Sequence, residues 1–175
     1  MESKFIRLVL LGVFSVFCSS VMGQNIQKHY VAKSLSDGVL YHVLPVTLFE
    51  NEASEKLTFD LTYKQDNKEV ILNFTYWQDQ PISADSVQFR NGTTILAGRV
   101  SKLYVEPDQK RWKHRYTLTE KMDKFGPFFA KKEAVEAIVY SNGVAYYYPM
   151  KKSAWNHFAP IGFKIFEMIK FNETK

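Results

Sequence analysis

Four histidines are the residues of this chain best suited to acid–base or metal chemistry: His29, His42, His114 and His157. Protein zinc sites usually draw two of their ligands from positions close together in the sequence. No two of these histidines lie two or four residues apart, and no Glu-x-x-His motif occurs. The sequence therefore predicts no metal site. We expect His42 and His114 to be partly buried strand residues with one hydrogen-bonded ring nitrogen.

The sequence contains no motif for nucleophilic catalysis or for nucleotide binding. The chain lacks a Gly-x-Ser-x-Gly elbow and a Gly-rich phosphate loop after a predicted strand. Its single cysteine, Cys18, falls in the leader described below, so thiol catalysis is not expected in the remaining chain. A hydrolase of envelope polymers stays open as an alternative, because two carboxylates about 5–9 Å apart would suffice and sequence does not set that distance. No cofactor is expected.

The segment Lys110–Leu118 is the most suggestive part of the chain. On a strand, Arg111, Lys113 and Arg115 point to one side, and Trp112, His114 and Tyr116 point to the other. A cationic strip of this kind suits an anionic glycan, a lipid headgroup or an envelope protein. An export signal argues against nucleic acid. The alternative is an amphipathic strand whose polar face is basic and whose Trp112 lies in the core.

Three consecutive tyrosines form a second candidate binding surface. Alternation places Tyr146 and Tyr148 on one side of a strand and Tyr147 on the other. Exposed tyrosines are rigid and amphipathic, which suits contacts with sugars and peptides. The alternative is a sandwich that buries aromatic side chains on both faces. We take Tyr146 and Tyr148, with the three basic residues above, as the predicted ligand-binding set.

Alternating apolar and polar residues dominate the chain and predict β-strands. The alternating segments are 39–44, 57–64, 70–77, 87–89, 94–96, 99–105, 110–118, 137–140 and 144–148. Asn91-Gly92 and Asn142-Gly143 predict hairpins, because a type I′ turn needs a positive φ at both central residues. Gln65-Asp66-Asn67 and Glu106-Pro107-Asp108 are also typical turn compositions. We expect a mostly β, single-domain antiparallel meander forming a β-sandwich or a partly open barrel, with one or two short helices.

Helix signals are few. Thr119–Phe125 is expected to form a short helix that Gly126-Pro127 stops, and Lys131–Glu136 has the composition of one or two helical turns. The tail, 160–171, suits a helix or a strand. Its Gly162, set among Phe and Ile residues, slightly favours the strand.

The N-terminal segment has the features of a signal peptide. Lys4 and Arg7 precede an apolar run over 8–18, and Val21-Met22-Gly23 suits cleavage before Gln24. The apolar run is short for a bilayer span, and the alternative to a signal peptide is an uncleaved anchor helix. No stretch of 18 or more apolar residues follows the leader, so no transmembrane segment is expected after cleavage. We therefore divide the chain into a signal peptide, 1–23, and one β-rich domain, 24–175, in which 24–33 is compatible with a mobile arm.

Composition and the leader together indicate the type of protein and its location. The chain is 46% hydrophobic and 15% aromatic with a net charge of +5, which excludes a wholly disordered protein. Gln24, directly after the predicted cleavage site, resembles the start of small uncharacterised exported proteins of Bacteroidota-type bacteria. An exported domain without cysteine after Cys18 suits the periplasm or cell surface of a Gram-negative bacterium, or secretion.

We expect an exported, non-enzymatic envelope protein that binds a ligand or partner through an aromatic and basic β surface. A structural component that pairs with its partner through an edge strand is the other alternative. The sequence does not set the oligomeric state.

Overall fold

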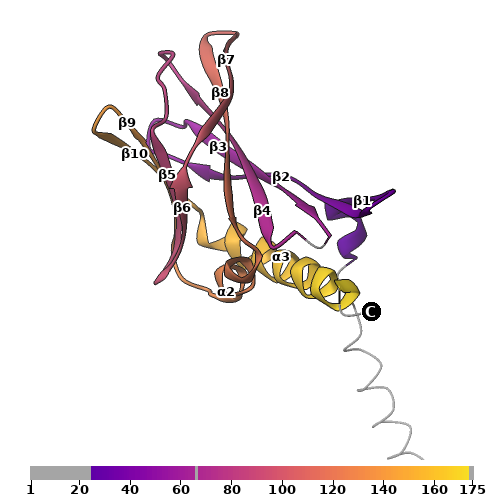
Figure 1. The fold of residues 1–175 in the computed structure, drawn as a ribbon. Coiled ribbons are helices and arrows are strands. Elements are labelled where there is room, and N and C mark those ends of the chain that lie inside the picture. Colours follow the sequence, from indigo (N-terminus) through magenta and orange to yellow (C-terminus); the bar gives the residue numbers. More distant parts are fainter. Residues whose placement is uncertain (1–24, 66, 174–175) are drawn as a thin grey trace, which may run out of the picture.

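The computed structural model describes residues 25–65 and 67–173, and antiparallel strands make up most of this part of the chain (Figure 1). The strands form a six-stranded sheet with the order β1-β2-β3-β4-β8-β7 and a four-stranded sheet with the order β10-β9-β5-β6. Their bounds are β1 Tyr30–Leu35, β2 Gly38–Glu50, β3 Lys56–Lys64, β4 Glu69–Gln78, β5 Ser86–Asn91, β6 Thr94–Arg99, β7 Ser101–Asp108, β8 Arg111–Lys121, β9 Val135–Ser141 and β10 Val144–Pro149. The expected mostly β class is confirmed. The expected signal peptide lies outside the described residues.

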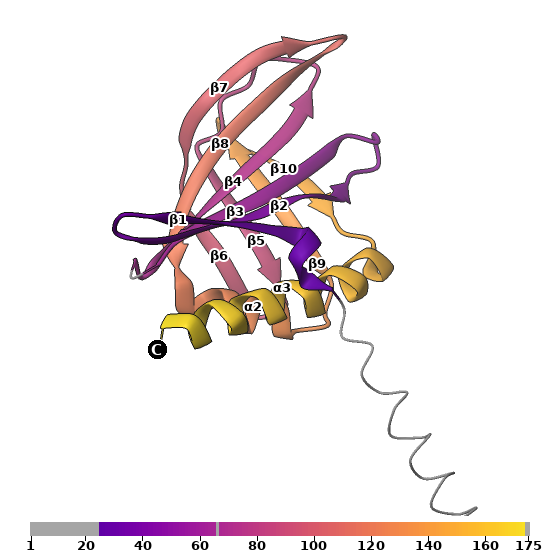
Figure 2. The same ribbon diagram turned by 90° about the vertical axis from the view of Figure 1, so that its right-hand side faces the viewer.

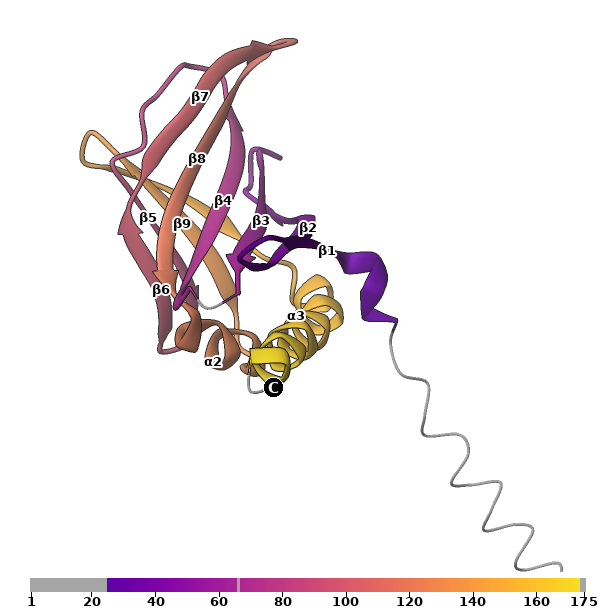
Figure 3. The same cartoon turned by 45° about the vertical axis from the view of Figure 1, so that its right-hand side comes forward.

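The two sheets bury their facing sides against each other, which gives a sandwich-like arrangement (Figure 3). Phe89 of the four-stranded sheet contacts Phe49, Phe59 and Phe74 of the six-stranded sheet, with ring centroids 5.8, 5.9 and 5.9 Å away. An isolated antiparallel bridge between Phe49 and Met150 also joins the sheets at one side. Aromatic packing of this kind supplies much of the core, since each ring buries a large apolar area.

Alternation along β4 and β8 decides what faces the core. On β4, Val70, Leu72, Phe74 and Tyr76 are buried and point inward. The register pairs Tyr76 with His114 and Thr75 with Arg115. Neighbouring residues of each strand therefore contribute to two chemically different faces of the same sheet.

The two Asn-Gly sequences form different turns. Asn142 and Gly143 have φ values of 48° and 78° and connect Ser141 to Val144, which confirms the type I′ turn there. Asn91 instead pairs with Thr94 as the last residue of its strand. The second hairpin is thus confirmed, but its turn is shifted by one residue.

Asn91 belongs to its strand and not to the turn because its side chain has hydrogen-bond partners in α2 and just after it. The side chain is buried, and its Nδ2 donates to the carbonyl oxygens of Phe128 at 2.6 Å and Lys131 at 3.0 Å. These hydrogen bonds hold the segment 128–131 against the hairpin. A contact distant in sequence therefore overrides the local turn preference.

The described part of the expected mobile arm, from residue 25 onward, has regular structure. Ile26–His29 forms a 3-10 helix, η1, and β1 follows it directly. Strand β1 pairs with β2 along its whole length, from Tyr30 opposite Val43 to Leu35 opposite Gly38. Gly38 has a φ of 126°, a conformation that favours glycine.

The tail is a helix, α3 (Lys152–Glu173), so the slight preference for a strand over 160–171 was wrong. Its buried residues recur every three or four positions, as Trp155, Phe158, Ile161, Ile165 and Ile169 do. A strand would have placed Phe163 beside Ile165, yet Phe163 is 37% exposed and Ile165 is fully buried. Pro160 lies inside the helix, where its missing N–H removes one backbone hydrogen bond.

The second helix also lies elsewhere than expected. Residues up to Lys121 belong to β8, Met122–Lys124 is a 3-10 turn, and α2 covers Phe125–Ala130. Gly126-Pro127 thus begins the helix instead of ending it, because a proline in the first turn needs no N–H partner. The turns expected over Lys131–Glu136 are absent from the structure, where Val135 and Glu136 belong to β9.

Helices α2 and α3 pack against each other at one end of the sandwich (Figure 1). A Cβ atom on Gly162 of α3 would lie only 2.7 Å from Cδ1 of Phe129 in α2. Glycine therefore permits the close approach of the two helices. The aromatic ring of Phe129 stacks on Trp155 and on Phe166, with centroids 5.7 and 5.6 Å apart.

Candidate functional site

The three predicted basic residues of β8 lie on the outer face of the six-stranded sheet, as their spacing requires, and each has an acidic neighbour. The shortest nitrogen–oxygen distances are 3.7 Å from Arg111 to Asp79, 3.3 Å from Lys113 to Glu106 and 2.7 Å from Arg115 to Asp60. The strip is thus largely neutralised by acids that come from three other parts of the chain.

Arg115 is the centre of a complete polar network. Its two terminal nitrogens donate to Asp60 Oδ1 at 2.7 Å and to Thr75 Oγ1 at 2.7 Å. The second carboxylate oxygen of Asp60 accepts a hydrogen bond from Asn73 Nδ2 at 2.8 Å. Asp60 is only 1% exposed although it lies on an outer face. These bonds leave Asp60 engaged as a structural anion.

Lys113 lies between an aromatic ring and an acid on the β7–β8 hairpin. Its Nζ is 5.2 Å from the ring centroid of Tyr104, a cation–π distance. Contact with Tyr104, reinforced by Glu106, raises the pKa of the Lys113 ammonium group. The lysine therefore stays charged, with part of its surface covered.

A groove opens further along the same outer face, toward the end of the β7–β8 hairpin. It has a volume of about 680 Å³, within the usual range for small-molecule sites. Its lining consists of Ser54, Lys56, Thr58, Trp77, Asp108, Gln109, Lys110 and Arg111. We call it the Trp77 groove.

Trp77 is fixed in this groove by its polar edge. The indole Nε1 donates to Asp108 Oδ2 at 2.8 Å, so the ring is anchored while the side chain stays partly exposed. Lys56 and Lys110 have no ion-pair partner among the described residues. The groove therefore combines one immobilised aromatic ring with two uncompensated cations and Arg111.

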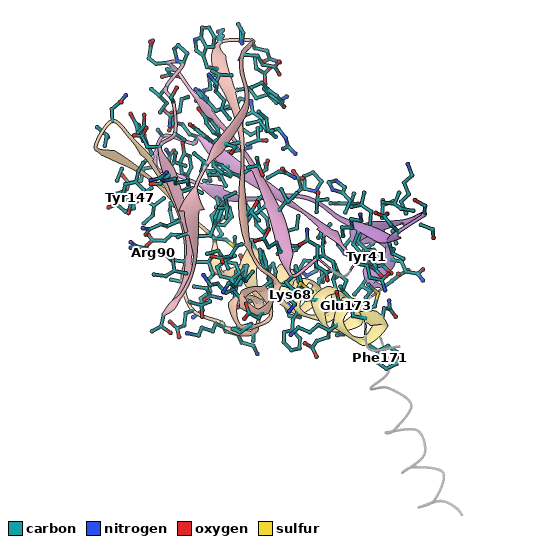
Figure 4. The ribbon with its side chains drawn as sticks, in the orientation of Figure 1. Tyr41, Lys68, Arg90, Tyr147, Phe171 and Glu173 are labelled. Atoms are coloured by element: carbon teal, nitrogen blue, oxygen red, sulfur yellow. The ribbon has the colours of Figure 1, made fainter. Side chains whose placement is uncertain are left out.

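The predicted tyrosines do not join the basic strip on one surface. Tyr148 is fully buried and Tyr146 is half-buried, and both point to the interior side of β10. Tyr147 is the exposed member, at 56%, and projects from the outside of the four-stranded sheet (Figure 4). The interior had to take two of the three tyrosines because β10 faces the core through its even-numbered residues.

The interior holds a second polar cluster, around His114, that sequence reasoning missed. Gln78 Nε2 donates to the hydroxyl of Tyr148 at 2.6 Å and to Glu55 Oε2 at 3.1 Å. Beside them, the rings of Tyr76 and His114 stack with centroids 4.7 Å apart. Alternation along β4 could have placed Tyr76 and Gln78 inside, but nothing local links them to Tyr148 or Glu55.

His114 differs from the expectation of one hydrogen-bonded nitrogen. The residue is fully buried, and neither ring nitrogen has a hydrogen-bond partner in the described residues. Burial lowers the pKa of His114, and the nearby backbone of Trp112, Tyr76 and Gln80 opposes this in part. The imidazole is therefore neutral at neutral pH. His42, by contrast, is half-buried, with Nδ1 3.3 Å from Thr62 Oγ1.

The buried tyrosines are also held in their neutral form. Burial raises the pKa of Tyr76, and the neighbouring Tyr116 and Tyr148 raise it further. Burial likewise raises the pKa of Tyr148. The hydroxyl of Tyr76 has no hydrogen-bond partner among the described residues. The interior cluster thus consists of neutral, tightly packed rings with spare hydrogen-bonding capacity.

In the part of the chain that the structure describes, no group of three His, Asp or Glu residues could hold a metal ion. None of the described helices is long and apolar enough to cross a bilayer. Comparisons with models of protein families, with curated proteins and with solved structures found no match for this chain. The Trp77 groove, which combines an anchored aromatic ring with unpaired cations, is the candidate site for ligand binding.

Proposed function

We propose that this protein is a non-enzymatic binding protein that takes an acidic sugar unit of a glycan in the Trp77 groove. The observation that carries the proposal is the pairing of an anchored indole with the cations Lys56, Lys110 and Arg111 around one concavity. An aromatic ring offers a flat surface to a sugar ring, and the cations attract its carboxylate. The proposal keeps the expected combination of aromatic and basic residues. Its aromatic residue is Trp77 in place of Tyr146 and Tyr148.

The charge of the groove supports an anionic ligand. Three cationic side chains and one acid, Asp108, line it, which leaves an excess of positive charge. Asp108 is already occupied by the Trp77 indole, and the contact between Arg111 and Asp79 is long, at 3.7 Å. Lys56 and Lys110 can therefore meet a carboxylate without first breaking a strong ion pair.

We further propose that the protein acts outside the cytoplasm, in the envelope or the medium. The support is the sequence of residues 1–23, with its basic start, apolar run and cleavage-compatible end. Mass spectrometry of the protein purified after expression of the whole chain tests this. A mature N-terminus at Gln24 is expected, and an intact N-terminus on protein recovered from the cytoplasm would contradict export.

The binding proposal is tested by calorimetric titration with oligogalacturonate and with the same oligomer fully methyl-esterified. The ester keeps the sugar rings but removes their charge. We expect binding of the acidic oligomer only, weakened about tenfold by Lys56→Gln with Lys110→Gln and more strongly by Trp77→Leu, because buried aromatic anchors dominate binding. Circular dichroism checks that each variant is folded.

A matched control uses two lysines outside the groove, Lys33→Gln with Lys102→Gln. This pair removes the same charge, so it should leave the affinity unchanged. Equal loss in the control and groove variants would show general charge attraction and contradict the proposal, as would equal affinity for the esterified oligomer. Cleavage of the oligomer during titration would instead favour the hydrolase alternative.

A further inference from the structure

A second candidate binding surface is formed by α2 and α3, at the end of the molecule away from the β7–β8 hairpin (Figure 1). A groove of about 520 Å³ runs between the two helices. Its lining residues are Phe129, Ala130, Lys132, Asn156, Ala159, Pro160 and Phe163. We call this surface the helical face. It is mainly apolar, and Phe163 remains 37% exposed at its edge.

Basic side chains surround this apolar groove. Lys132 lines it, Lys164 follows Phe163 on α3, and Lys152 lies at the start of the same helix. All three are exposed, and none has an ion-pair partner among the described residues. Three uncompensated lysines around exposed phenylalanine and proline form an amphipathic surface typical of proteins that lie on anionic bilayers.

Acidic groups do not cancel this charge. On the exposed arc of α3, Glu167 is the acid closest to Phe163 in sequence, and it is paired with Lys170 at 3.6 Å. Glu133, next to Lys132, does not line the groove, and its carboxylate lies against Gly92, where a side chain on that residue would be. The charge of the helical face is therefore positive where its apolar groove opens.

Helix η1, which begins at Ile26, lies next to α3 (Figure 2), and the Tyr30 hydroxyl donates to Met168 Sδ at 3.2 Å. None of the residues that line the groove belongs to η1 or β1. This contact therefore leaves the groove between α2 and α3 uncovered.

We propose that the helical face docks on the surface of an anionic lipid bilayer, with Phe163 entering the interface and Lys132, Lys152 and Lys164 contacting lipid phosphates. The Trp77 groove at the other end then points away from the bilayer and stays open to its ligand. The two proposals rest on different residues, so either can fail alone.

The test is co-flotation of the protein, purified after expression of the whole chain, with lipid vesicles. One set of vesicles is phosphatidylcholine alone, and the other also contains phosphatidylglycerol. We expect binding to the anionic vesicles only. The variant Phe163→Ser with Lys132→Gln and Lys164→Gln should lower the partition coefficient by about tenfold or more, because each lysine near an anionic surface contributes measurably to binding.

A matched variant on the six-stranded sheet combines Leu103→Ser and Lys102→Gln on β7 with Lys33→Gln on β1. It removes the same charge and an apolar side chain that is 52% exposed, against 37% for Phe163. It should bind like the wild type. Equal loss in both variants, equal binding to neutral vesicles or no binding to either vesicle would overturn the proposal. An unchanged partition coefficient in the helical-face variant would also overturn it, since any retention would then depend on other residues.

Discussion

Two polar clusters lie on opposite faces of β4 and β8, and they are built in opposite ways. On the outer face, Arg115, Asp60, Asn73 and Thr75 satisfy one another through short hydrogen bonds. On the inner face, the rings of Tyr76 and His114 are stacked and fully buried, yet the Tyr76 hydroxyl and both His114 nitrogens have no partner within the described residues. One cluster is held by charge pairing and the other by packing.

The difference shows that buried polar side chains are stabilised in different ways, by an opposite charge in one cluster and by aromatic packing in the other. Asp60 is buried because Arg115 covers it, so its desolvation is offset only while that cation remains. His114 is buried because neighbouring rings enclose it, so its stability depends on remaining neutral. The two clusters should therefore respond differently to mutation and to pH.

The largest expected effect is on the outer cluster. Arg115→Leu leaves the Asp60 carboxylate buried without a cation, and we expect a loss of about 3–5 kcal/mol in the free energy of unfolding. Urea denaturation followed by circular dichroism measures it. Adding Asp60→Asn removes the stranded charge and should recover more than half of the loss. A single variant as stable as the wild type would show that Asp60 does not depend on Arg115.

Acidification should act on the inner cluster instead. The folded-state pKa of His114 is lowered from 6.5, so the unfolded chain binds its proton first as the pH falls. This destabilises the folded state between pH 6.5 and the lower folded-state pKa. His114→Phe removes this titration, so its stability should fall less than that of the wild type over the same pH interval.

Urea denaturation at about pH 8 and about pH 5 compares the two proteins, since histidine titrates between these values. The difference between wild type and His114→Phe isolates this residue from the other titrating groups. At the higher pH, the two proteins should agree within about 1 kcal/mol, because a buried group without a partner contributes no hydrogen bond. An equal loss of stability in both proteins would show that His114 is not the source.

The smallest expected effects on stability are those of removing the hydroxyl groups of two buried tyrosines of the inner cluster. Tyr148→Phe removes the hydroxyl that accepts from Gln78 at 2.6 Å, so we expect a loss of about 1 kcal/mol. Tyr76→Phe removes a hydroxyl without a partner and should change stability by less than about 0.5 kcal/mol. Thermal unfolding of both variants measures the contrast. A larger loss for Tyr76→Phe would reveal a hydrogen bond to that hydroxyl.

The local pattern predicted much of this architecture. Period-two alternation placed Arg115 and His114 on opposite faces of one strand, as the structure has them. It did not predict Asp60 as the partner of Arg115, because that contact depends on β3 and β8 lying on either side of β4. The sequence offered Trp77 as a possible part of the aromatic surface and Arg111 as part of the basic strip, but it did not predict that they line one groove. The lining of that groove comes from separate strands and loops.

The tail shows where local pattern fails. The helical stripe of α3 begins at Trp155 and Phe158, before residues 160–171, for which the local sequence slightly favoured a strand. Gly162 suited a pleated strand in isolation, whereas in the structure it gives Phe129 room to approach. Helix and strand were close in local preference, and burial against α2 decided between them.

By itself, the sequence determined the strands from β2 onward, most hairpins and the faces of β4 and β8, because alternation and turn sterics act between neighbouring residues. It did not predict β1, most of which lies in the segment expected to be a mobile arm. Tertiary structure alone decided that Tyr148 is buried while Tyr147 is exposed, that the cations of β8 meet acids, and that the tail is helical. Each of these outcomes depends on which distant segment lies opposite, and the free energy of that contact exceeds the small local preferences.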